Sequence, residues 1–189
     1  MTSQAESVPQ ITAGMTMEEI LQRIPSAQRA LFQRYHVGGC SSCAFEPTDT
    51  LEKVCKDHNL LDVNEVLTHL QTAGEVDAKM SLEPTEVKAW LDAGETFQFL
   101  DVRGPREIEQ AALSQTTPLD YSKSKQYMEN PKDTRFVFIC KDGARSLDVA
   151  AYFAGHGFGA AYSVRGGLDA WRAQVDPTLP EFEAEQPLT

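Results

Sequence analysis

The fold of this chain is decided by residues 136–146, which read FVFICKDGARS. The first four of these residues are aromatic or β-branched, which is typical of a strand buried on both faces. A cysteine, a short polar turn with one glycine and a helix-like continuation over residues 147–153 follow directly. We therefore predict a strand, a loop and a helix, with the thiol of Cys140 in the first loop position.

The loop after this strand is predicted to hold an anion. Such a turn directs backbone N–H groups inward, and the following helix adds its unpaired N-terminal donors and the positive end of its dipole. The nearest candidate anion is the sulfur of Cys140, whose thiolate we expect to have a lowered pKa and to act as a nucleophile. The alternative is a buried cysteine that serves only as a small core residue.

Composition narrows the classes of protein to which the chain can belong. It has 189 residues, enough for one large domain or two small ones, and a formal net charge of −11 without a cluster of Lys or Arg. These features argue against nucleic acid and anionic membranes as partners. We find no membrane-length apolar segment and no secretory signal, and the four cysteines are unevenly placed. We therefore expect a cytoplasmic protein without a disulfide framework.

The first half of the chain is predicted to be helical. Residues 1–14 are polar and are expected to be disordered. Capping boxes then begin helices, at Thr16, Asp49 and Asp62. Pro25 divides the first helical segment in two, and Gly74 is expected to end the last helix. Since no strand pattern interrupts this half, residues 15–74 are predicted to form a small all-α domain.

From Met80 onward, the pattern changes to alternating strands and helices. Strands are expected at residues 97–103, 117–119, 136–139 and 160–164, and helices at residues 84–94, 121–129 and 147–153 and around Trp171. The stretch around Leu113 reads as loop. This alternation predicts an α/β domain with a mostly parallel sheet flanked by helices and a site at the carboxyl ends of the strands. Residues 176–189 are rich in Pro and Glu and are expected to form a loose tail.

Four motifs in this half follow the order found in the single-domain rhodaneses. They are DVR at residues 101–103, CKDGARS at 140–146, GHGF at 155–158 and RGGLDAW at 165–171. Residues 80–173 therefore resemble a rhodanese domain. The resemblance implies a sulfurtransferase that takes sulfane sulfur from thiosulfate or a persulfide onto Cys140. The resulting persulfide would pass its sulfur to cyanide, to a thiol acceptor protein or to a low-molecular-weight thiol.

Several residues around the thiol have expected roles. The persulfide-binding loop comprises Lys141, Asp142, Gly143, Ala144, Arg145 and Ser146, whose backbone N–H groups are expected to surround the sulfur. Arg145 either orients the loop or the anionic donor, or forms a structural pair with an acidic residue. Lys141 either attracts the donor or is a solvated loop residue. Ser146 is expected to cap the helix and also to donate a hydrogen bond to the loop. Asp101 and Arg103 are expected to be structural.

One segment of the second half, at residues 111–112, departs from the family pattern. Ala111-Ala112 replaces the usual Gly-His, which affects a neighbouring turn but not the loop itself.

The main alternative on this fold is a phosphatase or arsenate reductase of the dual-specificity type. Its loop has one more residue between Cys and Arg, to encircle a tetrahedral oxyanion. Because only four residues separate Cys140 from Arg145, the tighter ring favours a single sulfur atom.

The helical half contains a second cysteine motif, GGCSSC at residues 38–43. Residues 11–72 resemble short helical domains of unknown function that carry a similar turn and are often associated with iron–sulfur or nitrogen-oxide-related proteins. In one interpretation, Cys40 and Cys43 form a redox pair or accept sulfur from Cys140.

Two other interpretations of these cysteines stay open. A zinc ion or an iron–sulfur cluster would take its ligands from Cys40, Cys43 and Cys55, with His58 or His36 as the fourth. Otherwise the thiols are structural, and Cys55 only completes an apolar helix face. A non-enzymatic hypothesis also remains, in which the rhodanese fold presents a binding surface and the helical domain pairs with itself, as a homodimer, or with a partner.

The relay interpretation can be tested directly. If Cys40 and Cys43 pass on the sulfur from Cys140, a Cys40→Ser/Cys43→Ser double variant should lose most of its turnover with thiol acceptors. Sulfur loading of Cys140 should be unchanged in the same variant, since the donor reaction does not involve the pair. Normal turnover of the variant would exclude the relay.

Overall fold

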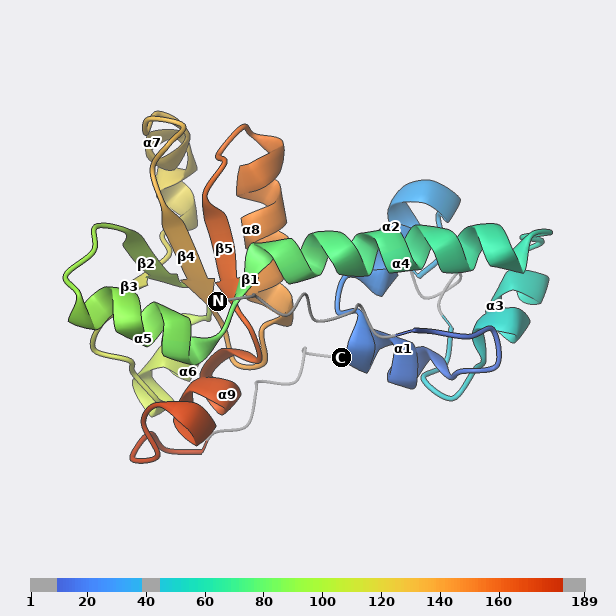
Figure 1. Ribbon diagram of the computed structural model, residues 1–189, viewed down its shortest axis with the longest axis horizontal. Helices are drawn as coiled ribbons and strands as arrows, with labels where there is room; N and C mark the ends of the chain where they lie inside the picture. The colour runs from blue at the N-terminus through green and yellow to red at the C-terminus, as the bar shows by residue number, and fades with distance from the viewer. Residues whose placement is uncertain (1–9, 39–44, 182–189) are drawn as a thin grey trace, which may run out of the picture. The chain divides into compact units, whose positions relative to one another are not determined.

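The computed structural model describes residues 10–38 and 45–181, and the chain divides into two compact units, Met1–Lys79 and Met80–Thr189 (Figure 1). Each unit buries its own cluster of apolar side chains. The two units are described separately below.

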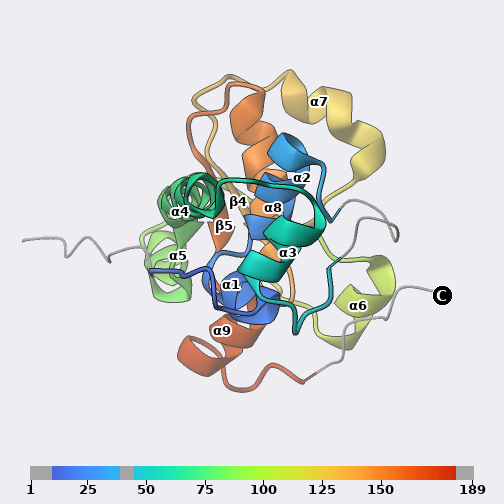
Figure 2. The ribbon, with the colours of Figure 1, turned by 90° about the vertical axis from the view of Figure 1, so that its right-hand side faces the viewer.

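The first unit is built from helices around one core. They are α1 (Met17–Arg23), α2 (Ala27–Tyr35), α3 (Leu51–Asp57) and α4 (Val63–Met80), all visible in Figure 2. The capping box predicted at Thr16 is present, since the Thr16 hydroxyl accepts a hydrogen bond from Glu19 N and the Glu19 carboxylate accepts one from Thr16 N. The core contains Leu31, Leu51 and Leu70, which are completely buried.

Two features of the helices in this unit differ from the predictions. The cap of α3 is Thr50, whose hydroxyl accepts a hydrogen bond from Lys53 N at 3.2 Å; Asp49 instead pairs with the Lys53 ammonium at 2.9 Å. The prediction that Gly74 ends α4 is wrong, because the helix continues to Met80. The reason is tertiary: Asp77, buried on the same side of α4 as Gly74, accepts a hydrogen bond from Ser26 N at 3.1 Å.

The two terminal segments that the sequence predicts to be disordered or loose are residues 1–14 and 176–189. Both include residues that pack against the folded units. Ile11 is buried in the first core, and the Ala13 carbonyl accepts a hydrogen bond from Glu52 N at 2.9 Å. At the other end, Leu179 packs against the second unit, and Arg172 pairs with Glu181 at 2.5 Å. Residues 1–9 and 182–189 lie outside the described part of the chain.

The second unit contains a five-stranded sheet whose strands are all parallel. The strands are β1 (Ser81–Leu82), β2 (Gln98–Asp101), β3 (Thr117–Pro118), β4 (Phe136–Ile139) and β5 (Ala161–Val164). Their order is β1-β5-β4-β2-β3. The helical elements are α5 (Pro84–Asp92), α6 (Pro105–Gln110), the 3-10 helix η1 (Tyr121–Lys123), α7 (Ser124–Met128), α8 (Ala144–Gly155) and α9 (Gly167–Gln174). The prediction of a parallel α/β sheet flanked by helices is confirmed.

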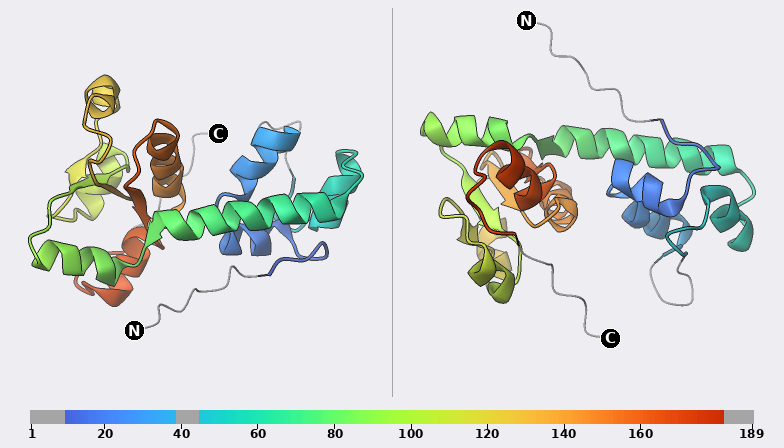
Figure 3. Two further views of the ribbon diagram at one scale, coloured as in Figure 1. Left: turned by 45° about the horizontal axis from the view of Figure 1, so that its top comes forward. Right: turned by 90° about the horizontal axis from the view of Figure 1, so that it is seen from below.

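Alternate residues of β4 face opposite layers of helices. Phe136, Phe138 and Cys140 belong to the cluster covered by α7 and α8, which lie beside each other in Figure 2. Val137 and Ile139 belong to the cluster on the other face, covered by α5 and α9, which are neighbours in Figure 3. The period of two along the strand therefore places Cys140 on the α8 side of the sheet.

A buried ion pair follows β2. The Arg103 guanidinium binds the Asp101 carboxylate through Nε–H to Oδ1 at 3.0 Å and Nη2–H to Oδ2 at 2.7 Å, and both side chains are fully buried. Arg103 also donates to the carbonyls of Glu107 and Ala111, at 3.1 and 2.7 Å. These contacts agree with the structural role expected for the pair. They also fix α6, a helix in a stretch where the sequence predicts loop.

Removing one member of this pair should strongly destabilise the second unit. We expect Arg103→Met to lower the free energy of unfolding by about 3–5 kcal/mol, because Asp101 is left as an uncompensated buried charge. Arg165→Met is the matched control: Arg165 pairs with Glu83 at the surface, and its loss should cost less than about 1 kcal/mol. Both tryptophans, Trp90 and Trp171, lie in this unit, so denaturant titration followed by fluorescence reports its unfolding. Equal stability of the two variants would contradict the prediction.

Candidate active site

Cys140 lies at the carboxyl end of β4, between two parallel neighbours. β4 pairs with β2 on one side and with β5 on the other. The Cys140 side chain is completely buried. The chain then turns away from the sheet, and the N-terminus of α9 holds the turn: Leu168 N donates to the Cys140 carbonyl at 2.8 Å, and Asp169 N donates to the Lys141 carbonyl at 3.0 Å.

The loop that follows surrounds the sulfur with hydrogen-bond donors. Gly143 N donates to Cys140 Sγ at 3.1 Å and Ser146 N at 3.4 Å. The Ser146 hydroxyl lies 3.4 Å from the same sulfur, and the thiol itself donates to Asp142 Oδ1 at 3.5 Å. The arrangement can therefore stabilise negative charge on sulfur by means of peptide groups and one hydroxyl.

Burial is the largest influence on the pKa of the Cys140 thiol. Burial raises the pKa of the Cys140 thiol above its ordinary value, and this effect outweighs the opposing hydrogen bonds from Ser146 and Gly143. The Asp142 carboxylate raises the pKa further. The lowered pKa expected from the sequence is therefore wrong, because complete burial of the sulfur outweighs the donors around it.

Close packing of the loop against the turn before α9 depends on glycines. Gly143 and Gly167 both have positive φ, +93° and +56°. A Cβ on Gly167 would lie 2.4 Å from the Cys140 carbonyl oxygen, and one on Gly143 would lie 2.9 Å from Gly166 N. Any side chain at either position would therefore push the loop away from β5 and α9.

Two charged side chains of the loop, Arg145 and Lys141, form ion pairs. Arg145 donates two hydrogen bonds to the Glu107 carboxylate, at 2.7 and 2.6 Å, and this guanidinium lowers the pKa of Glu107. The structural pair is thus the favoured interpretation of Arg145, with α6 tethered to α8. The Lys141 ammonium lies 2.8 Å from the Asp169 carboxylate on α9, so Lys141 is not simply solvated.

Ser146 does not cap α8, contrary to expectation. The N-cap is Gly143, and Ser146 lies in the first turn of the helix. Its hydroxyl is directed back into the loop, 3.2 Å from the Gly143 carbonyl and 2.8 Å from the hydroxyl of Ser163 on β5.

The cysteines of the first unit are only partly visible. Cys40 and Cys43 fall outside the described residues, so the structure says nothing about the pair. Cys55 is completely buried in the first core, and burial raises the pKa of its thiol. His58 ends α3. Among the residues that the structure describes, no three Cys, His, Asp or Glu side chains gather as metal ligands.

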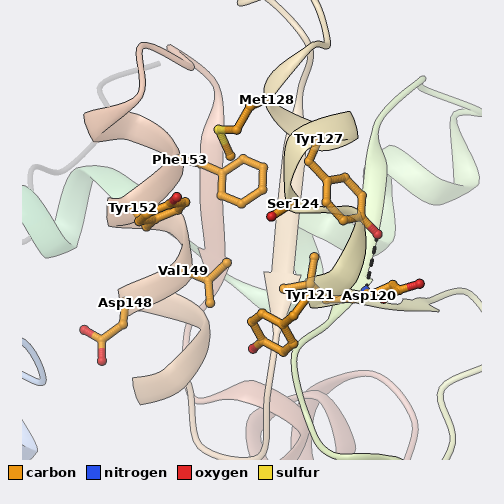
Figure 4. Close-up of a pocket in the computed structure, with 10 residues that line it drawn as sticks. Asp120, Tyr121, Ser124, Tyr127, Met128, Asp148, Val149, Tyr152 and Phe153 are labelled. Atoms are coloured by element: carbon orange, nitrogen blue, oxygen red, sulfur yellow. Dashed lines mark hydrogen bonds between the residues drawn. The ribbon is translucent and has the colours of Figure 1, made fainter.

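A groove of about 320 Å³ lies between α7 and α8 (Figure 4). Its lining is mostly apolar and includes Leu119, Tyr121, Tyr127, Met128, Tyr152 and Phe153. Tyr127 and Phe153 approach each other from the two helices, with ring centroids 6.3 Å apart. Burial raises the pKa of Tyr121, one of the residues that line the groove. Within residues 10–38 and 45–181, no helix is both long enough and apolar enough to cross a bilayer.

Sequence reasoning missed two residues that contact the loop, Glu107 and Ser163. Glu107 follows Gly104-Pro105, and a Pro at the first helical position with a Glu two residues later is a helix-start signal that could have revealed α6. Ser163 is a hydroxyl residue inside an otherwise apolar buried strand, which is a weaker signal, because its partner Ser146 is distant in sequence.

A methyl group at Gly167 should disrupt the loop. We expect Gly167→Ala to destabilise the second unit by about 1–3 kcal/mol through forced displacement of the Cys140 carbonyl. The unfavourable φ should add roughly 1 kcal/mol. Gly159→Ala is the control, since a Cβ there meets nothing within 4 Å and its φ is not positive. Denaturant titration of the two variants tests this, and similar stabilities would show that the close approach is not a constraint.

Comparison with known proteins places these features in a family. Residues 83–174 match the family model described as "Rhodanese-like domain". The putative sulfurtransferase YtwF of Bacillus subtilis is 32% identical over 92 residues, which are 48% of this chain and 88% of YtwF. A sulfurtransferase of Allochromatium vinosum is 36% identical over 78 residues, 41% of this chain and 73% of that protein.

Longer relatives and solved structures also match. The probable adenylyltransferase/sulfurtransferase MoeZ of Mycobacterium tuberculosis is 30% identical over 134 residues, 66% of this chain and 34% of MoeZ, so the chain spans about a third of that relative. A rhodanese-like domain protein from Staphylococcus aureus has a crystal structure with 23% identity and a TM-score of 0.42, covering 55% of this chain and 98% of that one. On the strength of the family match and of the B. subtilis and A. vinosum relatives, the chain belongs to the rhodanese-like family.

Proposed function

We propose that the second unit is a sulfurtransferase that carries sulfur as a persulfide on Cys140. The thiolate of Cys140 attacks the outer sulfur of thiosulfate, or of a related sulfane donor. The new S–S bond forms as the donor's S–S bond breaks, and sulfite leaves with the electron pair of the broken bond. The product is the anion Cys140–S–S⁻, so negative charge stays in the loop throughout.

The observation that carries this proposal is the pair of backbone donors aimed at the sulfur, Gly143 N at 3.1 Å and Ser146 N at 3.4 Å. Peptide N–H groups stabilise an anion by hydrogen bonds and need no positively charged side chain beside it. A loop with four residues between Cys140 and Arg145 makes a small ring, which suits one sulfur atom better than a phosphate.

The raised pKa of Cys140 means that the thiol must lose its proton before it attacks. Asp142 Oδ1 accepts the hydrogen bond from the thiol at 3.5 Å, so the proton leaves the sulfur on this side. Its carboxylate also accepts a hydrogen bond from Ala144 N at 3.0 Å, which holds it in place.

In the second half-reaction, an acceptor takes the terminal sulfur. Cyanide attacks that sulfur, the Cys140 S–S bond breaks, and thiocyanate leaves while the Cys140 thiolate is restored. A thiolate acceptor reacts in the same way and becomes a persulfide. The names of the relatives from B. subtilis and A. vinosum support sulfur transfer as the reaction class.

A mass measurement tests the proposal. After incubation with thiosulfate, the full chain should gain one sulfur atom on the peptide that contains Cys140, and free sulfite should appear in equal amount. Cys140→Ser should abolish both signals. Cys55→Ala should retain them, because Cys55 is buried in the first unit and takes no part.

Two outcomes would overturn the proposal. The absence of an adduct on the unmodified protein with any sulfane donor would favour a binding module, in which the intact loop serves only as a surface. Hydrolysis of a phosphate ester without sulfur uptake would favour the phosphatase alternative.

A further inference from the structure

A chain of buried hydroxyl groups lies behind the sulfur of Cys140. Ser146 Oγ is 3.4 Å from Cys140 Sγ, and Ser163 Oγ is 2.8 Å from Ser146 Oγ. Both hydroxyls also reach the Gly143 carbonyl oxygen, at 3.2 Å from Ser146 and 3.4 Å from Ser163. Ser146 and Ser163 are 0% and 1% exposed.

The two hydroxyls have fewer protons than there are acceptors within reach. Each hydroxyl donates one hydrogen bond, and the acceptors are the Gly143 carbonyl, the sulfur and the other hydroxyl. While the thiol keeps its own proton, Ser146 can donate to the Gly143 carbonyl. Once the sulfur is anionic, the strongest acceptor nearby is the sulfur, because hydrogen bonds to charged groups are the stronger ones.

When Ser146 turns toward the sulfur, the network needs a second donor. The Gly143 carbonyl still accepts the first helical hydrogen bond of α8, from Leu147 N at 3.1 Å, but it loses the hydroxyl. Ser163 can donate either to this carbonyl or to Ser146 Oγ. In the second case, it makes the Ser146 hydroxyl a better donor, because hydrogen bonds in a chain polarise one another.

We propose that Ser163 is a positioning residue, which allows Ser146 to turn its hydroxyl proton from the Gly143 carbonyl to the sulfur of Cys140 when that sulfur becomes anionic. Its role in turnover rests on the proposed sulfur transfer. Its effect on the thiolate does not, because an anionic sulfur requires no sulfur donor.

Several charged groups around Cys140 also act on the thiolate, and all of them stay in place when Ser163 is replaced. Asp142 lies in the loop, and Arg145 on α8 is paired with Glu107 on α6. Burial raises the pKa of Tyr121 on η1, and the charge of the Cys140 sulfur raises it further. On the adjacent elements, Lys141 pairs with Asp169 and Arg103 pairs with Asp101. A change caused by replacing Ser163 is therefore measured against a constant background of charge.

The test compares two variants of equal shape, Ser163→Thr and Ser163→Val, which differ only in the hydroxyl. The measurement is the rate of alkylation of Cys140 by iodoacetamide as a function of pH, followed on the Cys140 peptide by mass spectrometry. We expect the midpoint of Ser163→Val to lie about one pH unit above that of Ser163→Thr, since one hydrogen bond that favours the anion is lost. Below the midpoints, Ser163→Val should therefore react roughly tenfold more slowly.

A double-mutant cycle tests the route through Ser146. In a Ser146→Ala background, Ser163→Thr and Ser163→Val should have the same midpoint, because the hydroxyl that transmits the effect is absent. A shift that persists there would overturn the proposal, as would equal midpoints when Ser146 is present. It would also fail if Cys140 of the unmodified protein stayed unreactive at every pH, since an anionic sulfur is then never formed.

The same measurement separates this proposal from the proposed function. Loss of the thiosulfate adduct with an intact difference in alkylation would overturn sulfur transfer alone. An intact adduct with equal alkylation midpoints would overturn the role of Ser163 alone.

Discussion

The site depends on one close approach between two segments of backbone, at the point where β4 ends. The carbonyls of Cys140 and Lys141 accept hydrogen bonds from the first residues of α9, and Gly167 has no Cβ in the space that they occupy. This contact turns the chain sharply after the strand. As a result, the next backbone N–H groups point back at the sulfur rather than out to solvent, and the donors at Gly143 and Ser146 follow from it.

A second set of contacts runs from the sheet through α6 to α8. Arg103 is held by Asp101 and donates to two carbonyls of the α6 region, while Glu107 on α6 binds Arg145 on α8 with two hydrogen bonds. This explains why the departure at Ala111-Ala112 is compatible with the rest of the site. Arg103 contacts the carbonyl of Ala111, so the contact does not depend on which side chain that residue carries.

Much of this arrangement could be predicted from the sequence, and the rest depended on distant contacts. The strand and the loop follow from local patterns, because β-branched residues and glycines act within a few positions. The parallel sheet follows from the alternation of strands and helices along the chain. The extension of α4 past Gly74 could not be foreseen, since its cause is a hydrogen bond from Ser26 to Asp77, residues far apart in sequence. The pKa of Cys140 was predicted in the wrong direction for a related reason: the donors are local, whereas burial is produced by the whole fold.

The use of peptide groups around the sulfur has a consequence for regulation. A backbone N–H does not titrate and cannot be acetylated, phosphorylated or oxidised, so the loop keeps its affinity for an anionic sulfur when the surrounding chemistry changes. Control of such a site must therefore act on groups other than these donors, such as the sulfur atom, the Ser146 hydroxyl or the Asp142 carboxylate. Oxidation of Cys140 acts in this way, because it replaces the sulfur anion by a larger group within the same set of donors.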